Sequence, residues 1–303
     1  MRILIINIDS KIKNYALAKI EKYHQQEGDE IVWDIPLYRN IADRIYVSCI
    51  FEANRDKCFF WEDDSKVNIG GSGFDIESKL PAEIEAVRPR INLGFTTRGC
   101  IRKCPFCIVP QKEGSIKVVG DLLDLWGDGR NKNITLLDNN ILAVPNHFEY
   151  ICEQARKHKI RLDFTQGLDH RLLNQDIIDL LKSIRHAEPF FAWDNPADFN
   201  SVVVAINLMQ RNGIKRAGWY ILTGFNTTFE EDLFRADYLR SRGQFCYIMR
   251  YNNSKDRNLI PLAQWVNKRG WFYKMTFYEF LDTPFCTERD YKTIAINQLK
   301  GGV

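Results

Sequence analysis

Three cysteines in the middle of the chain have the spacing of an iron–sulfur ligand set. Cys100, Cys104 and Cys107 follow one another as C-x3-C-x2-C, with an aromatic residue directly before the third. Three thiolates can ligate three irons of a four-iron, four-sulfur cluster, which leaves the fourth iron without a protein ligand. A small molecule that carries adjacent amine and carboxylate groups can chelate that iron. The spacing therefore predicts a [4Fe-4S] cluster with one open iron.

A zinc site and three incidental core cysteines are the other interpretations of this triplet. Structural zinc takes a closed set of four ligands, and no fourth Cys or His lies nearby in the sequence. Incidental cysteines would have no reason to follow the first strand of a repeating strand–helix pattern. We therefore expect the cluster.

The elements that would position these cysteines alternate regularly from Asn92 onward. Apolar, strand-like runs recur six times, with helical patterns between them. The strands are expected at 92–97, 133–138, 160–165, 188–193, 217–222 and 244–250, and the helices at 119–127, 146–158, 174–185, 200–212, 228–242 and 258–269. This alternation predicts an α/β fold with a parallel sheet, and six units are too few for a closed eight-stranded barrel. An open, partial (β/α)6 barrel fits, with ligands at the carboxyl ends of its strands.

A shorter α/β segment precedes this pattern. Strand-like runs at 2–7, 30–35 and 46–52 accompany a helical pattern at 14–26, and a Gly-rich, turn-like segment follows at 67–75. We expect a small N-terminal α/β domain over residues 1–90 and the partial barrel with a C-terminal extension over residues 91–303. Because the sequence offers no membrane span and no cleavable leader, we expect a cytoplasmic protein with no membrane partner.

The cysteine motif and its position resemble those of the radical S-adenosylmethionine (SAM) superfamily, over about residues 92–251. The surrounding text, TRGC–CPFCIVPQKEG, is similar to the cluster loops of methylthiotransferases and of the group whose N-terminal domains bind cobalamin. The resemblance implies an enzyme that cleaves SAM reductively at a [4Fe-4S] cluster and generates a 5′-deoxyadenosyl radical. Its electrons would come from a donor such as flavodoxin or ferredoxin.

The resemblance also implies where SAM would be held. In the superfamily, polar residues at the strand ends bind SAM, although this sequence departs from the usual Gly-Gly-Glu turn after the second strand. The matching positions here are Asp138, Asn139, Gln166, Arg171, Asp194 and Gly224. Most of them have a structural alternative, because Asp and Asn also cap helices and form turns. The sequence identifies no catalytic residue that acts on the substrate.

The charge of the chain says little about that substrate. The chain has 42 Lys and Arg residues and 39 Asp and Glu residues, which gives a net charge of +3. This is not the strong basic excess that is typical of a nucleic-acid-binding protein. Four cations flank the cysteines, namely Arg98, Arg102, Lys103 and Lys112. They would either balance the charge of an anionic cluster or bind an anionic substrate such as a nucleotide.

Two alternative functions and one further cofactor are also to be considered. Methylation or methylthiolation of RNA or a nucleotide is the alternative among enzymes, but methylthiotransferases carry a second cluster on three N-terminal cysteines, and only Cys49 and Cys58 lie there in this chain. A non-catalytic iron–sulfur redox sensor is the alternative of another class. Cobalamin bound through a histidine is not expected, because the only histidine before the cysteines is His24, in the middle of a helical pattern.

Overall fold

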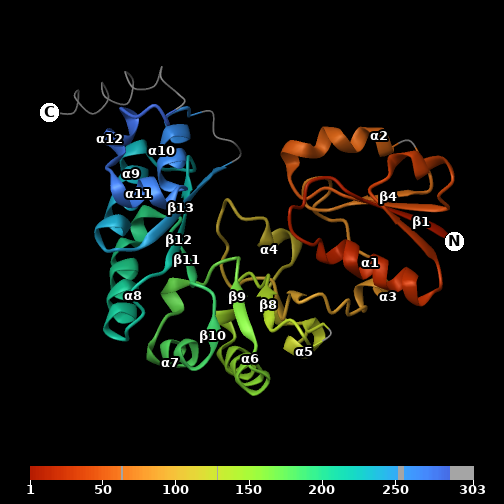
Figure 1. Cartoon of the computed structure of the whole chain (residues 1–303), viewed down its shortest axis with the longest axis horizontal. Coiled ribbons are helices and arrows are strands. Elements are labelled where there is room, and N and C mark those ends of the chain that lie inside the picture. The colour runs from red at the N-terminus through yellow and green to blue at the C-terminus, as the bar shows by residue number, and fades with distance from the viewer. Residues whose placement is uncertain (63, 128, 252–255, 287–303) are drawn as a thin grey trace. The chain divides into compact units, whose positions relative to one another are not determined.

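The computed structural model describes residues 1–62, 64–127, 129–251 and 256–286. The chain divides into two units, Met1–Asn139 and Asn140–Val303, so the division falls after the second strand of the repeating pattern rather than near residue 90. Each unit combines helices with parallel strands (Figure 1), which confirms the α/β class. Among the helices of the described ranges, none has both the length and the apolar character needed to span a membrane.

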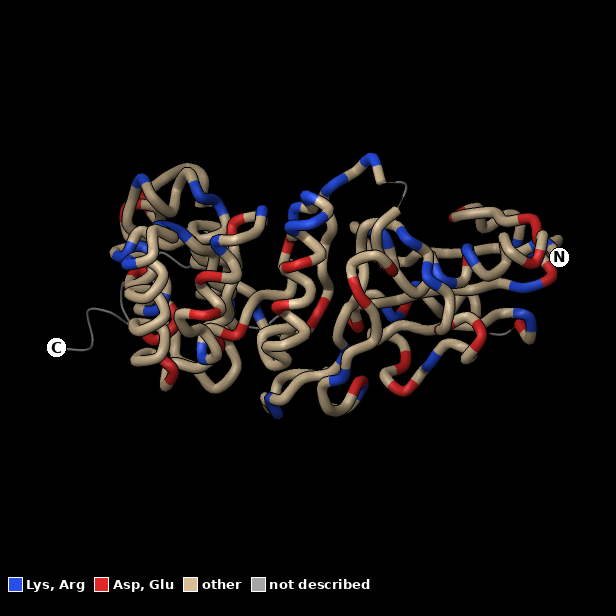
Figure 2. Tube along the Cα trace, turned by 90° about the horizontal axis from the view of Figure 1, so that it is seen from below, with Lys and Arg blue, Asp and Glu red and all other residues tan. Residues whose placement is uncertain are grey.

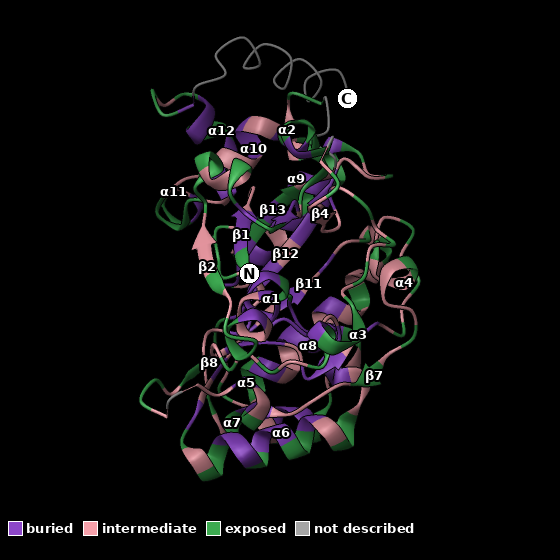
Figure 3. Cartoon of the chain, turned by 90° about the vertical axis from the view of Figure 1, so that its right-hand side faces the viewer, coloured by how far each residue is buried: buried purple, intermediate pink, exposed green. Residues whose placement is uncertain are grey.

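Unit 1 begins with a four-stranded parallel sheet in the order β2-β1-β3-β4. Its strands are β1 (Arg2–Asn7), β2 (Glu30–Trp33), β3 (Arg44–Ser48) and β4 (Val67–Gly70), and its helices are α1 (Tyr15–Gln26), η1 (Pro36–Asn40), η2 (Glu52–Cys58), α2 (Phe59–Glu62) and α3 (Ala82–Glu85). Side chains alternate across a strand, so Ile3 and Ile5 pack with Leu17 of α1, whereas Leu4 packs with Trp61 of α2. The sheet therefore has a core on each face. Figure 3 colours the buried residues purple along the ribbon.

The strand β4 lies where the sequence predicts a turn. Its register pairs Val67 with Ile45 and Ile69 with Val47, and both of its apolar side chains pack against the core around Trp61. The expectation of a turn was wrong for these four residues. Two alternating apolar residues suffice beside a buried partner strand, but they are too few to distinguish a strand from a loop in the sequence.

The second half of unit 1 carries the three cysteines. It contains β5 (Leu93–Gly94), β6 (Thr97–Arg98), α4 (Val109–Lys112), β7 (Lys117–Val118), α5 (Leu122–Leu125) and β8 (Asn133–Leu136). β5 runs parallel to β8, whereas β6 pairs antiparallel with β7. The single strand expected over 92–97 is therefore two short strands, because the chain changes pairing partner between Gly94 and Thr97.

Unit 2 continues the alternation of strands and helices. Its strands are β9 (Arg161–Phe164), β10 (Arg185–His186), β11 (Phe190–Ala192), β12 (Gly218–Thr223) and β13 (Phe245–Arg250). Its helices are η3 (Ile141–Ala143), α6 (Pro145–His158), η4 (His170–Leu172), α7 (Gln175–Ser183), η5 (Pro196–Asp198), α8 (Phe199–Arg211), α9 (Phe229–Ser241), α10 (Leu259–Val266), α11 (Arg269–Lys274) and α12 (Phe277–Leu281). β9 and β10 are parallel, and β11-β12-β13 form a parallel sheet.

Candidate functional site

The three cysteines lie on one loop, which leaves β6 at Gly99 and returns to β7; we call residues 99–113 the cysteine loop. Gly99 has a φ of 84°, and a Cβ there would collide with the carbonyl oxygens of Gly114 and Ser115. Only glycine allows the two ends of the loop to approach this closely. The amide of Cys100 then donates to the Gly114 carbonyl over 3.3 Å. The first cysteine therefore lies at the point where the two ends of the loop meet.

The donors of the cysteine loop fit an iron–sulfur cluster by their chemistry. Cys100, Cys104 and Cys107 are all half-buried, and thiolates are the ligands that such clusters take. The amide of Arg102 donates to Cys100 Sγ over 3.3 Å, a contact that stabilises a thiolate ligand. Within the part of the chain that the structure describes, no group of three or more His, Cys, Asp or Glu side chains is arranged to hold a metal ion. The fit therefore rests on donor type and order.

Asp138, expected at the amine of SAM, contacts the stem of the cysteine loop instead. Its carboxylate accepts hydrogen bonds from the amides of Thr96 and Thr97 and from both threonine hydroxyls, each hydroxyl at 2.7 Å. The side chain is buried, and this burial raises the pKa of the Asp138 carboxyl while the threonine hydrogen bonds oppose the rise. Asp138 therefore anchors the chain that leads into the cysteines.

Asn139 contacts the same loop through a residue that the sequence analysis did not single out, Glu113. Asn139 Nδ2 donates to Glu113 Oε2 over 2.6 Å, and the amide of Gly99 donates to the same oxygen over 2.8 Å. Arg98 pairs with the other oxygen, Oε1, at 2.9 Å. One carboxylate thus joins the stem of the loop, its far end and the end of β8.

Two of the four cations around the cysteine loop, Arg98 and Lys112, are partly buried. Arg98 is paired with Glu113 and its guanidinium lies 4.1 Å from the centroid of the Phe95 ring. Burial lowers the pKa of Lys112, and repulsion from Arg98 adds to that shift. Figure 2 shows Lys and Arg interspersed with Asp and Glu along the chain. Charge balance within the loop explains Arg98 without an anionic substrate.

In unit 2, the third strand of the repeating pattern ends in a polar cluster around Asp169. Arg171 Nε donates to Asp169 Oδ1 over 2.7 Å, and Arg171 Nη1 lies 3.5 Å from an oxygen of Asp198. Asn140 Nδ2 donates to the second oxygen of Asp169 over 3.1 Å. Gln166 is exposed. A SAM carboxylate at Arg171 would therefore share the guanidinium with two protein carboxylates.

Asp194, which follows β11, has a carboxyl group with one buried oxygen, Oδ1, that lacks a hydrogen-bond partner among the residues that the structure describes. Burial raises the pKa of Asp194 to about 6, although the positive charge of Arg235 opposes the rise. The helix-capping role falls to its neighbour Asn195, whose side chain accepts from the Ala197 amide. Asp194 is thus a poorly satisfied acceptor at a strand end, as a ligand-binding residue would be.

Replacing Asp194 with Asn should stabilise the protein above pH 6. The folded-state pKa of about 6 lies above the ordinary 3.8, so the folded protein binds more protons between these values and its stability falls as the pH rises through them. Asn carries no charge and escapes this penalty. We expect the variant to exceed the wild type by about 1–3 kcal/mol at pH 7.5, and to match it near pH 4. Urea titrations at both pH values measure this, and equal stability at pH 7.5 would contradict the burial of the charge.

Gly224 follows β12, and a buried arginine holds the chain beside it. Gly224 has a φ of 74°, which favours glycine. The fully buried Arg235 pairs with Asp232 and donates to the carbonyl oxygens of Trp193 and Leu222 over 2.7 and 2.8 Å. The sequence analysis missed Arg235, because nothing in a helix sequence marks an arginine as buried.

The N-terminal residues considered for further cofactors are engaged within unit 1. Burial raises the pKa of Cys49 to about 12 and also raises that of Cys58. Both thiols are buried, and Cys49 Sγ donates to the Phe51 carbonyl oxygen over 3.4 Å. His24 lies 2.6 Å from Asp29 Oδ2 through Nδ1 and 3.0 Å from the Tyr46 hydroxyl through Nε2, so both ring nitrogens have partners.

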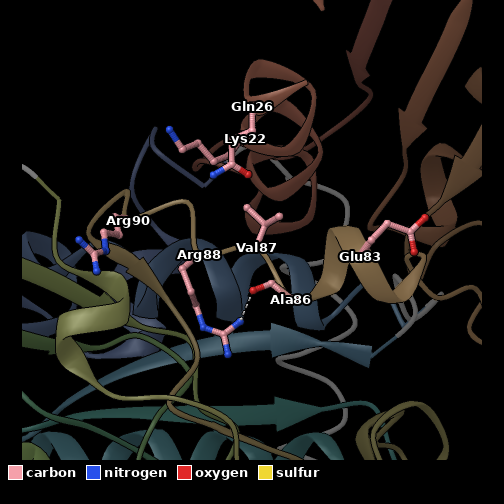
Figure 4. A pocket seen from close by; sticks show the side chains of 7 residues that line it. All are labelled: Lys22, Gln26, Glu83, Ala86, Val87, Arg88 and Arg90. Atoms are coloured by element: carbon pink, nitrogen blue, oxygen red, sulfur yellow. Dashed lines mark hydrogen bonds between the residues drawn. The ribbon is translucent and has the colours of Figure 1, made fainter. Parts of the chain in front are cut away.

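A pocket of about 560 Å³ lies elsewhere in unit 1. It is lined by Lys22, Gln26, Glu83, Ala86, Val87, Arg88 and Arg90 (Figure 4). The guanidinium of Arg88 donates hydrogen bonds to the carbonyl oxygens of Ala86 and Val119. These bonds stabilise the segment that follows α3. None of the predicted site residues lines this pocket.

The chain was also compared with known proteins. No family model matches it, and no curated protein matches it.

Proposed function

We propose that this protein is a radical SAM enzyme with a partial (β/α)6 barrel. The observation that carries the proposal is the loop of Cys100, Cys104 and Cys107, which follows the first strand of the alternating pattern. Its stem is fixed by Asp138, which follows the second strand. Parallel strands support it further, because their carboxyl ends gather ligand-binding loops at one edge.

The three cysteines would hold a [4Fe-4S] cluster. When bound, such a cluster supplies an electron to SAM, which breaks into methionine and a 5′-deoxyadenosyl radical that abstracts hydrogen from a substrate. The protein's part is to present three thiolates on a loop closed at Gly99 and to supply the amide of Arg102 to Cys100 Sγ. Flavodoxin or ferredoxin is the class of electron donor that we propose.

The contacts to SAM would come from the strand ends. We propose Asp194 for the ribose hydroxyls, because its unpartnered oxygen is able to accept a hydrogen bond from them. The carboxyl group, with a pKa of about 6, is ionised at neutral pH. The Asp194→Asn substitution is therefore expected to weaken SAM binding about ten- to hundredfold. Gln166, Arg171 and Gly224 remain proposed contacts, whereas Asp138 and Asn139 serve SAM through the loop that they hold.

The test is conversion of SAM to 5′-deoxyadenosine. The protein is reconstituted with iron and sulfide under anaerobic conditions, reduced with dithionite or a flavodoxin system, and its products are separated by liquid chromatography. Formation of 5′-deoxyadenosine that depends on both the reductant and the iron supports the proposal. A protein that binds the cluster but leaves SAM intact is a redox sensor, and this result would overturn the proposal.

The same assay separates the methylation alternative. A methyltransferase or methylthiotransferase also forms S-adenosylhomocysteine from SAM, and isotope from labelled methyl groups appears in the acceptor RNA or nucleotide. The second cluster of a methylthiotransferase takes three N-terminal cysteines, and only Cys49 and Cys58 precede the cysteine loop in this sequence. The substrate itself is a separate question, and an anionic one lacks support from Arg98, which is paired with Glu113.

Cobalamin is not expected to bind through a protein histidine. His24 has partners at both ring nitrogens, inside helix α1. At the carboxyl end of the sheet, a Cβ on Gly71 or Gly73 would collide with the backbone of Cys49 and Phe51, so these loops already fill the space beside one another. Protein purified from cobalamin-fed cells should show no cobalamin spectrum with nitrogen ligation. Stoichiometric cobalamin with such a spectrum would contradict this expectation.

A further inference from the structure

Glu113 joins three separate pieces of chain through one carboxylate. Its Oε2 accepts from the Gly99 amide over 2.8 Å and from Asn139 Nδ2 over 2.6 Å, and its Oε1 pairs with Arg98 at 2.9 Å. The side chain is only 10% exposed, against 28% for that of Arg98. Hydrogen bonds to an ionised acceptor are stronger than those between neutral groups, and partial burial reduces their screening by solvent.

These contacts close the cysteine loop across its whole length. Gly99 directly precedes Cys100, whereas Glu113 follows the short helix α4, which lies beyond Cys107. The contact between Gly99 and Glu113 therefore brackets all three cysteines. Closing a loop costs chain entropy. When protein contacts have already closed the loop, a ligand binds without this entropic cost. The hydrogen bond from Asn139 connects the same carboxylate to the segment that follows β8.

We propose that Glu113 is the positioning residue of the cysteine loop, holding Cys100 ready to ligate the cluster and fixing the loop to the end of β8. The inference rests on the proposed function, since it concerns the cluster that the three cysteines would bind. Glu113 acts through Gly99, Arg98 and Asn139 and needs no contact with the iron. Residues that orient metal ligands in this way commonly change metal affinity about ten- to hundredfold when they are replaced.

Two substitutions separate the hydrogen bonds of Glu113 from its charge. Glu113→Ala removes every contact. Glu113→Gln keeps the shape and one acceptor oxygen for Gly99 and Asn139, but it turns an N–H donor towards Arg98 and so breaks the ion pair. Glu149, an exposed residue of α6, is the matched control as Glu149→Ala and Glu149→Gln.

The first measurement is iron retention, with ferrous iron and sulfide as the probe and a competing iron chelator in the buffer. Glu113→Ala should hold iron about ten- to hundredfold less tightly than the wild type, while both Glu149 variants match it. Glu113→Gln should retain more iron than Glu113→Ala, and its reduction potential should move to a more positive value because one negative charge is lost beside an anionic cluster. The electron paramagnetic resonance spectrum of the reduced protein should change in the same variant.

The second measurement needs no iron. In cluster-free protein, Cys100 should react with iodoacetamide several-fold faster in Glu113→Ala and Glu113→Gln than in the wild type or the Glu149 variants. If Glu113→Ala does not fold, the inference is tested with Glu113→Gln alone, through the alkylation rate of Cys100 and the reduction potential of the cluster. A wild type that takes up no cluster overturns the proposed function and the inference with it. A wild type that takes up a cluster, with Glu113 variants equal to it in retention, potential and alkylation, overturns the inference alone.

Discussion

The triple variant Cys100→Ala, Cys104→Ala and Cys107→Ala is expected to contain no iron–sulfur cluster and to form no 5′-deoxyadenosine from SAM. The reason is that these thiolates are the whole protein ligand set that the sequence offers at this position, and a cluster with one open iron has no spare ligand to lose. Each single variant should lose SAM cleavage as well. Iron and sulfide per chain, the visible absorbance of the cluster, and product chromatography measure these effects.

The fold of the triple variant should remain intact, because the three side chains are only half-buried and the closed end of the loop depends on Gly99, Glu113 and Asp138. Circular dichroism of cluster-free wild type and variant should therefore agree. Cys152→Ala is the matched control, because Cys152 is buried in α6 and burial raises its pKa to about 12, so its loss should leave iron content unchanged. A triple variant with full iron and sulfide would remove the basis of the proposed function.

The regular elements were predictable where hydrophobic periodicity is strong. The strands β12 and β13 and the helices α6, α8 and α9 lie close to their expected positions, because each is long enough for its apolar pattern to repeat. The short elements were not predictable. β4 has two inward apolar residues, Val67 and Ile69, and the interruption between β5 and β6 depends on a change of partner strand that no local pattern records.

The candidate site was predictable in its residue types but not in its contacts. The cysteine spacing needs no structure, because three soft ligands in one loop define their own chemistry. Asp138 was expected to face a ligand, but its carboxylate binds Thr96 and Thr97, which are more than 40 residues away in the chain. Sequence places a polar residue at a strand end without showing which neighbour it meets. Glu113 illustrates the same limit, since its three donors come from two other segments, Arg98 with Gly99 and Asn139.

Arg235→Ala is expected to destabilise the protein by about 3–5 kcal/mol, because it breaks a buried ion pair from one side. Arg235 and Asp232 are both buried, and the two side chains form an ion pair. The substitution also removes the donors to the carbonyl oxygens of Trp193 and Leu222. Urea unfolding of unit 2, followed by tryptophan fluorescence because Trp193 is buried there, measures the loss.

The location of these two carbonyl groups extends the prediction from stability to ligand binding. Trp193 directly precedes Asp194, and Leu222 lies two residues before Gly224, so Arg235 fixes two strand ends that we propose as SAM contacts. Under conditions where Arg235→Ala is still folded, its affinity for SAM should fall together with its stability. The double variant Arg235→Met and Asp232→Leu removes both charges and should recover most of the stability, but not the positions of the strand ends. Arg211→Ala, on the exposed end of α8, should change stability by less than about 0.5 kcal/mol. If Arg235→Ala matched Arg211→Ala, neither the buried pair nor the carbonyl contacts would contribute to holding β11 and β12.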